Sequence, residues 1–328
     1  MNERVLITGA SGFLGYHIVL AALQKNLKVF AAVRKNSLVE HLKGLPITFL
    51  YLDYSQIEDL HQQLLENKIN YIIHAAGVTK ALVQKEYDVV NANYSINLAK
   101  AAAGSSLYFK KMVFISSLAA CGPATNNLSS IDEKMVPNPL TAYGRSKLLA
   151  ENELSKIPIP LVILRPTAIY GPRDKDIFIM IKTISKGIDP YLGKIMQQLS
   201  FVHAHDVAVV AVNALQINNT GTYVITDGYS YNRYTFAALT KNILQQKTIR
   251  FHIPMPLVKI MAYVLEITNG WMKKNTVINR EKLLELAARN WTCDITKAKE
   301  ELEFKPTFNL EKGLKNSIEW YKENKLLK

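Results

Sequence analysis

The chain alternates short runs of consecutive apolar residues with longer stretches in which apolar residues recur every three or four positions. The runs are RVLIT (4–8), KVFAAV (28–33), ITFLYL (47–52), NYIIHAA (70–76), KMVFIS (111–116), PLVILR (160–165) and TYVIT (222–226). Strands that are apolar on both faces are typical of a parallel sheet covered by helices on both sides. Helical stretches between the runs, such as Leu14, Ile18 and Ala22, supply the crossovers that parallel strands require. The pattern predicts an α/β fold built on a doubly wound parallel sheet.

The alternation changes after YGP (170–172), where helical patterns, prolines and aromatic residues predominate. We therefore predict that residues 1–170 and 201–228 form the sheet domain, and that residues 171–200 and 229–328 form a smaller, mainly helical C-terminal lobe. Ligands of open α/β sheets bind beyond the carboxyl ends of the strands. A second lobe closing over that edge would form a substrate cleft.

The first predicted strand runs directly into TGASGFLG (8–15), and an amphipathic helix follows. Glycines with this spacing permit a tight turn, close approach of a pyrophosphate and close packing of helix on strand. The helix N-terminus offers N–H groups and positive potential to the phosphates. The motif predicts a Rossmann-type dinucleotide-binding domain whose loop contacts the cofactor through Thr8, Gly9, Ser11, Gly12, Phe13, Leu14 and Gly15.

The end of the second strand indicates which dinucleotide is bound. An acidic residue there holds the ribose 2′-hydroxyl of NAD, whereas this chain carries Arg34 and Lys35. A guanidinium suits a 2′-phosphate, so we expect NADP, with NAD as the possible alternative. After the third strand, Asp53 is expected to accept from the adenine amino group, although it could instead cap the next helix, and Tyr54 is expected beside it.

The stretch TAYGRSK (141–147) places a phenol and an ammonium four residues apart, hence on one face of a helix. A free phenol has a pKa of about 10, and a nearby ammonium is expected to lower that pKa. Tyr143 and Lys147 are thus candidates for a general acid/base pair, although such pairs also occur as ordinary surface residues. Ser116 and Ser117, at the carboxyl end of a predicted strand, would face the same cleft.

Taken together, these motifs resemble the extended short-chain dehydrogenase/reductase family, also called the NAD-dependent epimerase/dehydratase family. The resemblance covers nearly the whole chain, in the family's order: TGASGFLG (8–15), IIHAAG (72–77), NANYSINLAKAA (91–102), FISSLAACG (114–122), TAYGRSK (141–147), LRPTAIYGP (164–172), FVHAHDVA (201–208) and WTCDITKAKEELEFKP (291–306).

The resemblance implies a role for each matching residue. Tyr143 would be the acid/base, Lys147 would lower its pKa and hold the nicotinamide ribose, Ser117 would bind the substrate oxygen, and Asn91 would support the site. Further cofactor contacts would come from Ala75, Ala76, Gly77, Ser116, Pro166, Ala168 and Ile169, and a further substrate contact from Thr79. Two positions depart from the family pattern: Cys121 replaces a tyrosine and Tyr94 a small residue.

Composition and charge indicate which kinds of partner the protein has. The 328 residues carry a net charge of +13, but the lysines are scattered and no basic, aromatic RNA-binding string occurs, so no nucleic-acid partner is expected. Two cysteines, and an N-terminus without an export pattern, indicate the cytoplasm.

His203 and His205 are expected in a structural turn, with no metal. The apolar stretch 254–267 is expected to pack inside the lobe rather than contact a membrane, and a homodimer is possible.

We therefore predict an NADP-dependent oxidoreductase that transfers a hydride between nicotinamide and a carbonyl or secondary alcohol. The alternatives are a nucleotide-sugar epimerase or dehydratase and a non-catalytic dinucleotide-binding regulator. Nucleotide-sugar members of the family commonly carry an asparagine where this chain has Ala168, and an arginine where it has Gln198, Leu199 and Ser200. A diphosphate should not be buried without such partners, which favours a non-nucleotide, fairly apolar substrate.

Overall fold

A computed structural model describes residues 3–105, 107–126, 129–258, 260 and 280–327. All seven predicted strands are present and form one parallel sheet in the order β11-β6-β5-β4-β1-β2-β3. The strands are β1 (Arg4–Thr8), β2 (Lys28–Ala32), β3 (Ile47–Leu50), β4 (Tyr71–His74), β5 (Lys111–Ile115), β6 (Leu161–Pro166) and β11 (Gly221–Ile225). The predicted Rossmann-type α/β fold is confirmed.

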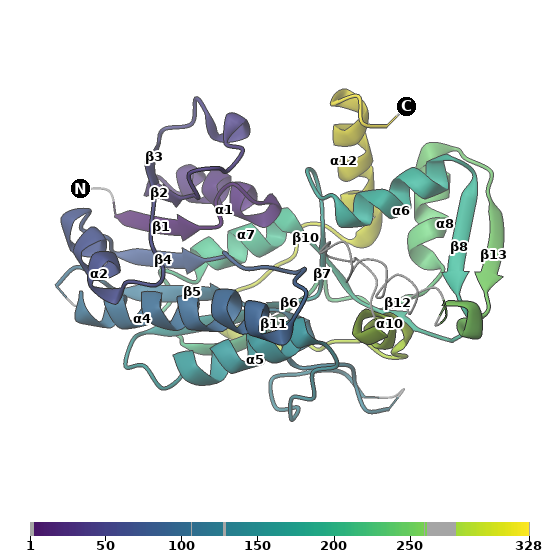
Figure 1. Ribbon diagram of the computed structural model, residues 1–328. Helices are drawn as coiled ribbons and strands as arrows, with labels where there is room; N and C mark the ends of the chain where they lie inside the picture. Colours follow the sequence, from purple (N-terminus) through teal and green to yellow (C-terminus); the bar gives the residue numbers. More distant parts are fainter. Residues whose placement is uncertain (1–2, 106, 127–128, 259, 261–279, 328) are drawn as a thin grey trace.

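Helices cover both faces of this sheet (Figure 1). Alternate strand residues point to opposite faces, so Val5 and Ile7 belong to one apolar core while Leu6 belongs to the other. The first core is completed by α1 (Phe13–Gln24) and α7 (Ala204–Asn213), the second by α2 (Ile57–Glu66), α4 (Tyr94–Gly104) and α5 (Ala142–Leu154). Burial on both sides explains why the strands read as continuous apolar runs.

The direction of strand succession reverses between β1 and β4. From β1 the chain proceeds outward through β2 and β3, then crosses back to β4 and proceeds the other way. Thr8 and His74, the last residues of β1 and β4, are register neighbours. The segments that follow them, the glycine loop and residues 75–77, therefore lie side by side where open α/β sheets bind ligands.

A third core lies in the C-terminal part of the chain, drawn to the right in Figure 1. It joins residues of β7 (Ala168–Tyr170), α6 (Asp176–Ser185), β8 (Ile188–Leu192), β10 (Phe201–His203), α8 (Thr235–Leu244) and α12 (Leu310–Glu323). Three small sheets accompany it: β7 with β10, β8 with β13 (Ile249–Ile253), and β9 (Gln198–Leu199) with β12 (Tyr231–Asn232).

The hydrophobic cores include residues from both of the predicted domains. Phe201 packs in the C-terminal core, whereas Ile295, Ala298 and Leu302, around α11 (Thr296–Glu301), pack in the first core of the sheet. The division into two domains at the predicted residues stays a prediction. Of the apolar stretch 254–267, residues 259 and 261–267 lie outside the described residues, so its packing stays a prediction. None of the described helices is long and apolar enough to cross a bilayer.

Short helical turns connect the larger elements near the carboxyl edge of the sheet. They are η1 (Glu40–Leu42), α3 (Gln84–Tyr87), the π-helical turn η2 (Asp88–Asn93), η3 (Leu118–Ala120) and α10 (Arg280–Ala287). The π-helical turn leads directly into α4, and turns of this kind often mark functional sites.

Candidate active site

The glycine loop joins β1 to α1 through backbone contacts that a side chain would prevent. Gly9 has a φ of +67°, and a Cβ there would lie 2.9 Å from the backbone of Ala75. A Cβ on Gly15 would lie 2.0 Å from the carbonyl oxygen of Gly9. No side chain caps the N-terminus of α1, so its first N–H groups can donate hydrogen bonds to phosphate oxygens. The geometry fits the predicted dinucleotide.

A buried hydrogen-bonded chain holds the ends of β1 and β4 together. The Ser95 hydroxyl donates to Asn91 O (2.8 Å), so its oxygen accepts from His74 Nε2 (2.9 Å). His74 Nδ1 then accepts from the Thr8 hydroxyl (2.7 Å), whose oxygen accepts from Ala76 N (3.1 Å). Burial lowers the pKa of His74 to about 3, which keeps the ring neutral as this chain requires.

The buried Thr8 hydroxyl therefore links the glycine loop to His74 and to the backbone of Ala76. Sequence reasoning did not single out His74. A histidine inside the apolar run NYIIHAA was the signal, since a buried histidine needs partners on both ring nitrogens.

Asn91 lies in the π-helical turn η2 and is completely buried. Its Oδ1 accepts from Val78 N (2.8 Å), and its Nδ2 donates to Val78 O (3.0 Å) and to Ser146 Oγ (3.0 Å). Asn91 thus connects the segment after β4 with the helix α5. This is the geometry of a supporting residue, and its role in the reaction stays a prediction.

The helix α5 carries Tyr143 into contact with the turn that follows β5. Thr141 caps the helix by accepting from Gly144 N (3.1 Å). A Cβ on Gly144 would lie 2.2 Å from Ala119 O, so only glycine permits this approach of α5 to η3. Ser117 caps η3 by accepting from Ala119 N (3.2 Å), and its hydroxyl lies close enough to Tyr143 to act on the pKa of that phenol. The structure therefore brings together two of the predicted catalytic groups.

The expected lowering of the Tyr143 pKa is wrong for the protein alone. The pKa of Tyr143 is raised to about 12, chiefly by burial; the Ser117 hydroxyl opposes this rise, and the charge of Glu285 adds a smaller increase. Burial also lowers the pKa of Lys147 to about 8. Lys147 Nζ donates to Ile115 O (2.9 Å) and lies 4.8 Å from the centre of the Phe114 ring. Desolvation outweighs the attraction that sequence spacing suggested.

Below Lys147 lies a buried ion pair that sequence reasoning missed. Glu151, one turn further along α5, accepts from Arg165 Nη2 (2.6 Å) and Nε (3.1 and 3.2 Å). Ser116 donates its hydroxyl to the same carboxylate. The Ser116 side chain is thus directed into this network, so any contact with the cofactor would come from its backbone. Glu151 continues the four-residue spacing of Tyr143 and Lys147, which was the available signal.

Around the expected adenosine site, Arg34 and Lys35 are exposed just beyond β2. Within the described part of the chain, neither forms an ion pair with a carboxylate. Asp53 Oδ1 accepts from Ser55 N (2.9 Å) and Ser55 Oγ (2.6 Å), which lowers its pKa and fixes the turn before α2. Tyr54 stacks on Tyr94 with 5.9 Å between ring centres.

The remaining predicted contacts lie near the start of β7 and after β4. Pro166 ends β6, Ala168 begins β7 with its side chain exposed, and Ile169 packs against the first core. Thr79 O accepts from the Tyr87 hydroxyl (3.2 Å), and the Tyr87 ring stands edge-on to Tyr143, 6.3 Å between centres. Sequence reasoning missed Tyr87 as a neighbour of the reactive tyrosine.

His203 and His205 lie at the start of α7. His203 Nδ1 accepts from His205 N (3.3 Å) as the helix cap, and its ring stacks on Phe308 at 4.2 Å. Among the described residues, no three histidine, cysteine or acidic side chains are grouped so that they could hold a metal ion. The His203 ring is thus held by the helix cap and by stacking on Phe308, and the expected lack of a metal stays a prediction.

A sequence model of the "NAD dependent epimerase/dehydratase family" matches residues 5–256. The chain belongs to this family. The resemblance inferred from the motifs is thereby confirmed, and the chain is a nicotinamide-dependent enzyme of the extended short-chain type.

Its relatives include both reductases and epimerases. It is 24% identical over 324 residues to a ceramide reductase of Caulobacter vibrioides, covering 97% of this chain and 94% of that protein. It is 26% identical over 338 residues to a UDP-glucose 4-epimerase of Vibrio cholerae (97% and 95% covered). It is 25% identical over 350 residues to a decarboxylating sterol-4-alpha-carboxylate 3-dehydrogenase of Candida albicans (98% of each).

Solved structures resemble the whole chain. The UDP-glucose 4-epimerase of Thermotoga maritima, determined with UDP-glucose, superposes with a TM-score of 0.80 at 20% identity, covering 98% of this chain and 99% of that one. The enzyme WbmG of Bordetella bronchiseptica, determined with NAD and UDP, also gives 0.80 at 17% identity, covering 100% and 97%. At these identities the likeness supports the fold alone.

Proposed function

We propose that this enzyme uses NADP to interconvert a carbonyl group and a secondary alcohol on a non-nucleotide, fairly apolar small molecule. The observation that carries the proposal is that Ala168 and residues 198–200, where nucleotide-sugar members of the family commonly carry an asparagine and an arginine, provide neither. The choice of NADP rests separately on the positions of Arg34 and Lys35.

The preference for NADP follows from charge. Arg34 and Lys35 are exposed at the end of β2, and no carboxylate stands in the position that would hold a ribose 2′-hydroxyl. A 2′-phosphate would give both cations a partner, and a charge-assisted hydrogen bond contributes roughly 1.5–3 kcal/mol. The glycine loop and the uncapped start of α1 would hold the pyrophosphate.

The catalytic steps follow from the groups around Tyr143. Bound NADPH would supply the hydride that reduces the carbonyl carbon. The Ser117 hydroxyl would donate a hydrogen bond to the carbonyl oxygen, and Tyr143 would donate its proton to that oxygen as the C–O double bond becomes single. Lys147, held by Ile115 O, would stabilise the resulting phenolate. In the direction of oxidation, the same groups would remove the proton from the alcohol.

The substrate preference follows from residues 168 and 198–200. Ala168 is exposed and offers only a methyl group. Ser200 is buried and donates to Tyr229 O (3.4 Å), while Gln198 accepts from Ser230 Oγ (3.1 Å). The buried Arg233 donates both Nη groups to backbone carbonyls, those of Ile195 (2.6 Å) and Leu192 (3.0 Å), so these groups hold the protein backbone.

The nucleotide-sugar epimerase or dehydratase is the second candidate, because a UDP-glucose 4-epimerase is as similar to this chain as a ceramide reductase is. Net oxidation of NADPH with a panel of ketones and aldehydes separates the two, since an epimerase returns the hydride. Calorimetric titration of the NADP-saturated enzyme with UDP, dTDP and GDP tests the substrate directly. We expect weak or absent binding, and micromolar affinity for any of them would replace the reductase proposal with the epimerase one.

A further inference from the structure

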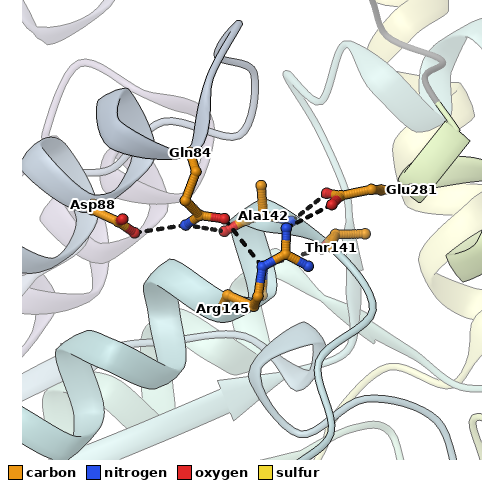
Figure 2. Close-up of polar contacts among 7 residues, drawn as sticks. Gln84, Asp88, Thr141, Ala142, Arg145 and Glu281 are labelled. Atoms are coloured by element: carbon orange, nitrogen blue, oxygen red, sulfur yellow. Dashed lines mark hydrogen bonds and ion pairs between the residues drawn. The ribbon is translucent and has the colours of Figure 1, made fainter.

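The first turn of the active-site helix is held by a residue from the far end of the chain. Glu281 lies in the first turn of α10, and its carboxylate contacts two groups on α5 (Figure 2). Its Oε2 accepts from Ala142 N (2.5 Å) and its Oε1 from Arg145 Nη2 (2.6 Å). These two partners stand on either side of Tyr143.

The contact continues beyond α5. Arg145 Nε donates to Gln84 Oε1 (3.1 Å), and Gln84 Nε2 donates to Asp88 Oδ1 (2.6 Å) and Ala142 O (3.2 Å). Figure 2 shows this series running from α10 through α5 to the segment of Gln84 and Asp88. That segment leads into the π-helical turn that carries Asn91. Three separate parts of the chain thus meet around the backbone of Tyr143.

The strength of the contact favours positioning over stability. The side chains of Arg145 and Glu281 are 44% and 35% exposed, and exposed ion pairs contribute little to folding. The bond to Ala142 N, by contrast, satisfies a donor that the helix itself cannot satisfy. Loss of this bond would loosen the turn that carries the phenol without unfolding the protein.

We propose that Glu281 is a positioning residue, which holds the first turn of α5 so that Tyr143 meets the substrate oxygen in line for proton transfer. The inference rests on the proposed acid/base role of Tyr143. It assigns a function to the C-terminal segment, because α10 then fixes the geometry of a group on the sheet domain as well as contributing to the substrate lobe.

A neighbouring carboxylate provides the matched control. Glu285 lies one turn after Glu281 on α10, and its charge also acts on Tyr143. Its own ion pair is with Lys282 of the same helix (2.7 Å). Glu285→Gln therefore removes a similar charge from the same helix but leaves the bonds to Ala142 and Arg145 in place.

The test measures hydrogen exchange of the Ala142 amide, the steady-state kinetics and the melting temperature in the same variants. In Glu281→Gln, hydrogen exchange of the Ala142 amide should accelerate about tenfold or more, because its acceptor is weakened. We expect kcat to fall about tenfold or more, NADPH affinity to change less than about twofold, and the melting temperature to stay within about 3 °C. Glu281→Asp keeps the charge but not the reach, so it should keep the pH profile of kcat and lose the amide protection.

The Glu285 control distinguishes loss of the bond to Ala142 from loss of a negative charge on α10. Glu285→Gln should leave the Ala142 amide protected. Unchanged amide exchange in Glu281→Gln, or faster exchange with an unchanged kcat, would overturn the inference, as would an equal loss of NADPH binding. Failure of the proposed function would show instead in the wild type, as epimerisation without net oxidation of NADPH. The kcat ratio is then measured in that reaction, because Tyr143 exchanges the proton in both.

Discussion

Replacing Lys147 with methionine should stabilise the protein in the absence of cofactor, although it removes a group that the reaction needs. Lys147 is 4% exposed, and burial lowers its pKa from 10.5 to about 8. A change of one in pKa corresponds to about 1.4 kcal/mol, so the buried ammonium disfavours folding by about 3 kcal/mol at pH 7. Methionine fills a similar volume without charge, but loses the bond to Ile115 O, worth about 1 kcal/mol.

The dependence on pH distinguishes this effect from better packing. The folded-state pKa lies below the unfolded one, so the unfolded chain binds more protons between pH 8 and pH 10.5. The stability of the wild type therefore rises with pH across this window relative to the variant. We expect Lys147→Met to be more stable by about 1–2 kcal/mol at pH 7, and the advantage to disappear by about pH 10.

Urea unfolding at pH 7 and pH 10, followed by tryptophan fluorescence and circular dichroism without cofactor, measures the difference. Lys111→Met is the matched comparison, because Lys111 is also buried but donates to the carbonyls of Ala214 (3.4 Å), Asn219 (3.2 Å) and Ile217. Its loss leaves several acceptors unpaired, so this variant should be destabilised. A Lys147→Met protein that is less stable than the wild type at pH 7, or whose advantage is the same at pH 10, would refute the reasoning.

Three further variants test the site. Tyr143→Phe should reduce kcat by about 10² or more while NADPH affinity stays nearly unchanged, since only the transferable proton is lost; steady-state kinetics and fluorescence titration measure the two. Arg34→Ala should weaken NADPH about tenfold and NADH hardly at all, and equal affinities in the wild type would contradict a 2′-phosphate site. Gly144→Ala would place a Cβ 2.2 Å from Ala119 O, so its melting temperature should drop by several degrees, whereas a wild-type value would show that α5 can move.

The sequence was informative wherever one local pattern sets the structure. Continuous apolar runs predicted all seven strands of the main sheet, with ends that differ by only one or two residues. The glycine spacing predicted the β1–α1 loop, because at Gly9 and Gly15 a side chain would collide with backbone. The spacing of Tyr143 and Lys147 placed both residues on one helix next to Ser117.

The features that could not be predicted depend on residues far apart in the chain. Glu281 and Ala142 are 139 positions apart, and nothing near either residue indicates the other. The sequence pattern assigned no role to Glu151 or Arg165, yet α5 and β6 bury them as an ion pair. The pKa of Tyr143 was misjudged for the same reason, since spacing reveals a neighbouring charge but not the depth of burial.

The distribution of charge also bears on which ligands the enzyme accepts. Cations stand at the end of β2, where the adenosine end of the cofactor is expected. On the other side, burial raises the pKa of Tyr87, whose ring contacts that of Tyr143, and the charges of Glu281, Glu285 and Glu86 add smaller increases. Glu281 and Glu285 are paired with Arg145 and Lys282, so their charges are largely balanced. The burial of Tyr143 disfavours an anionic group beside it, because the desolvation of that group would lack compensation. A neutral ketone or alcohol carries no such desolvation penalty, which agrees with the proposal of an uncharged substrate beside an anionic cofactor.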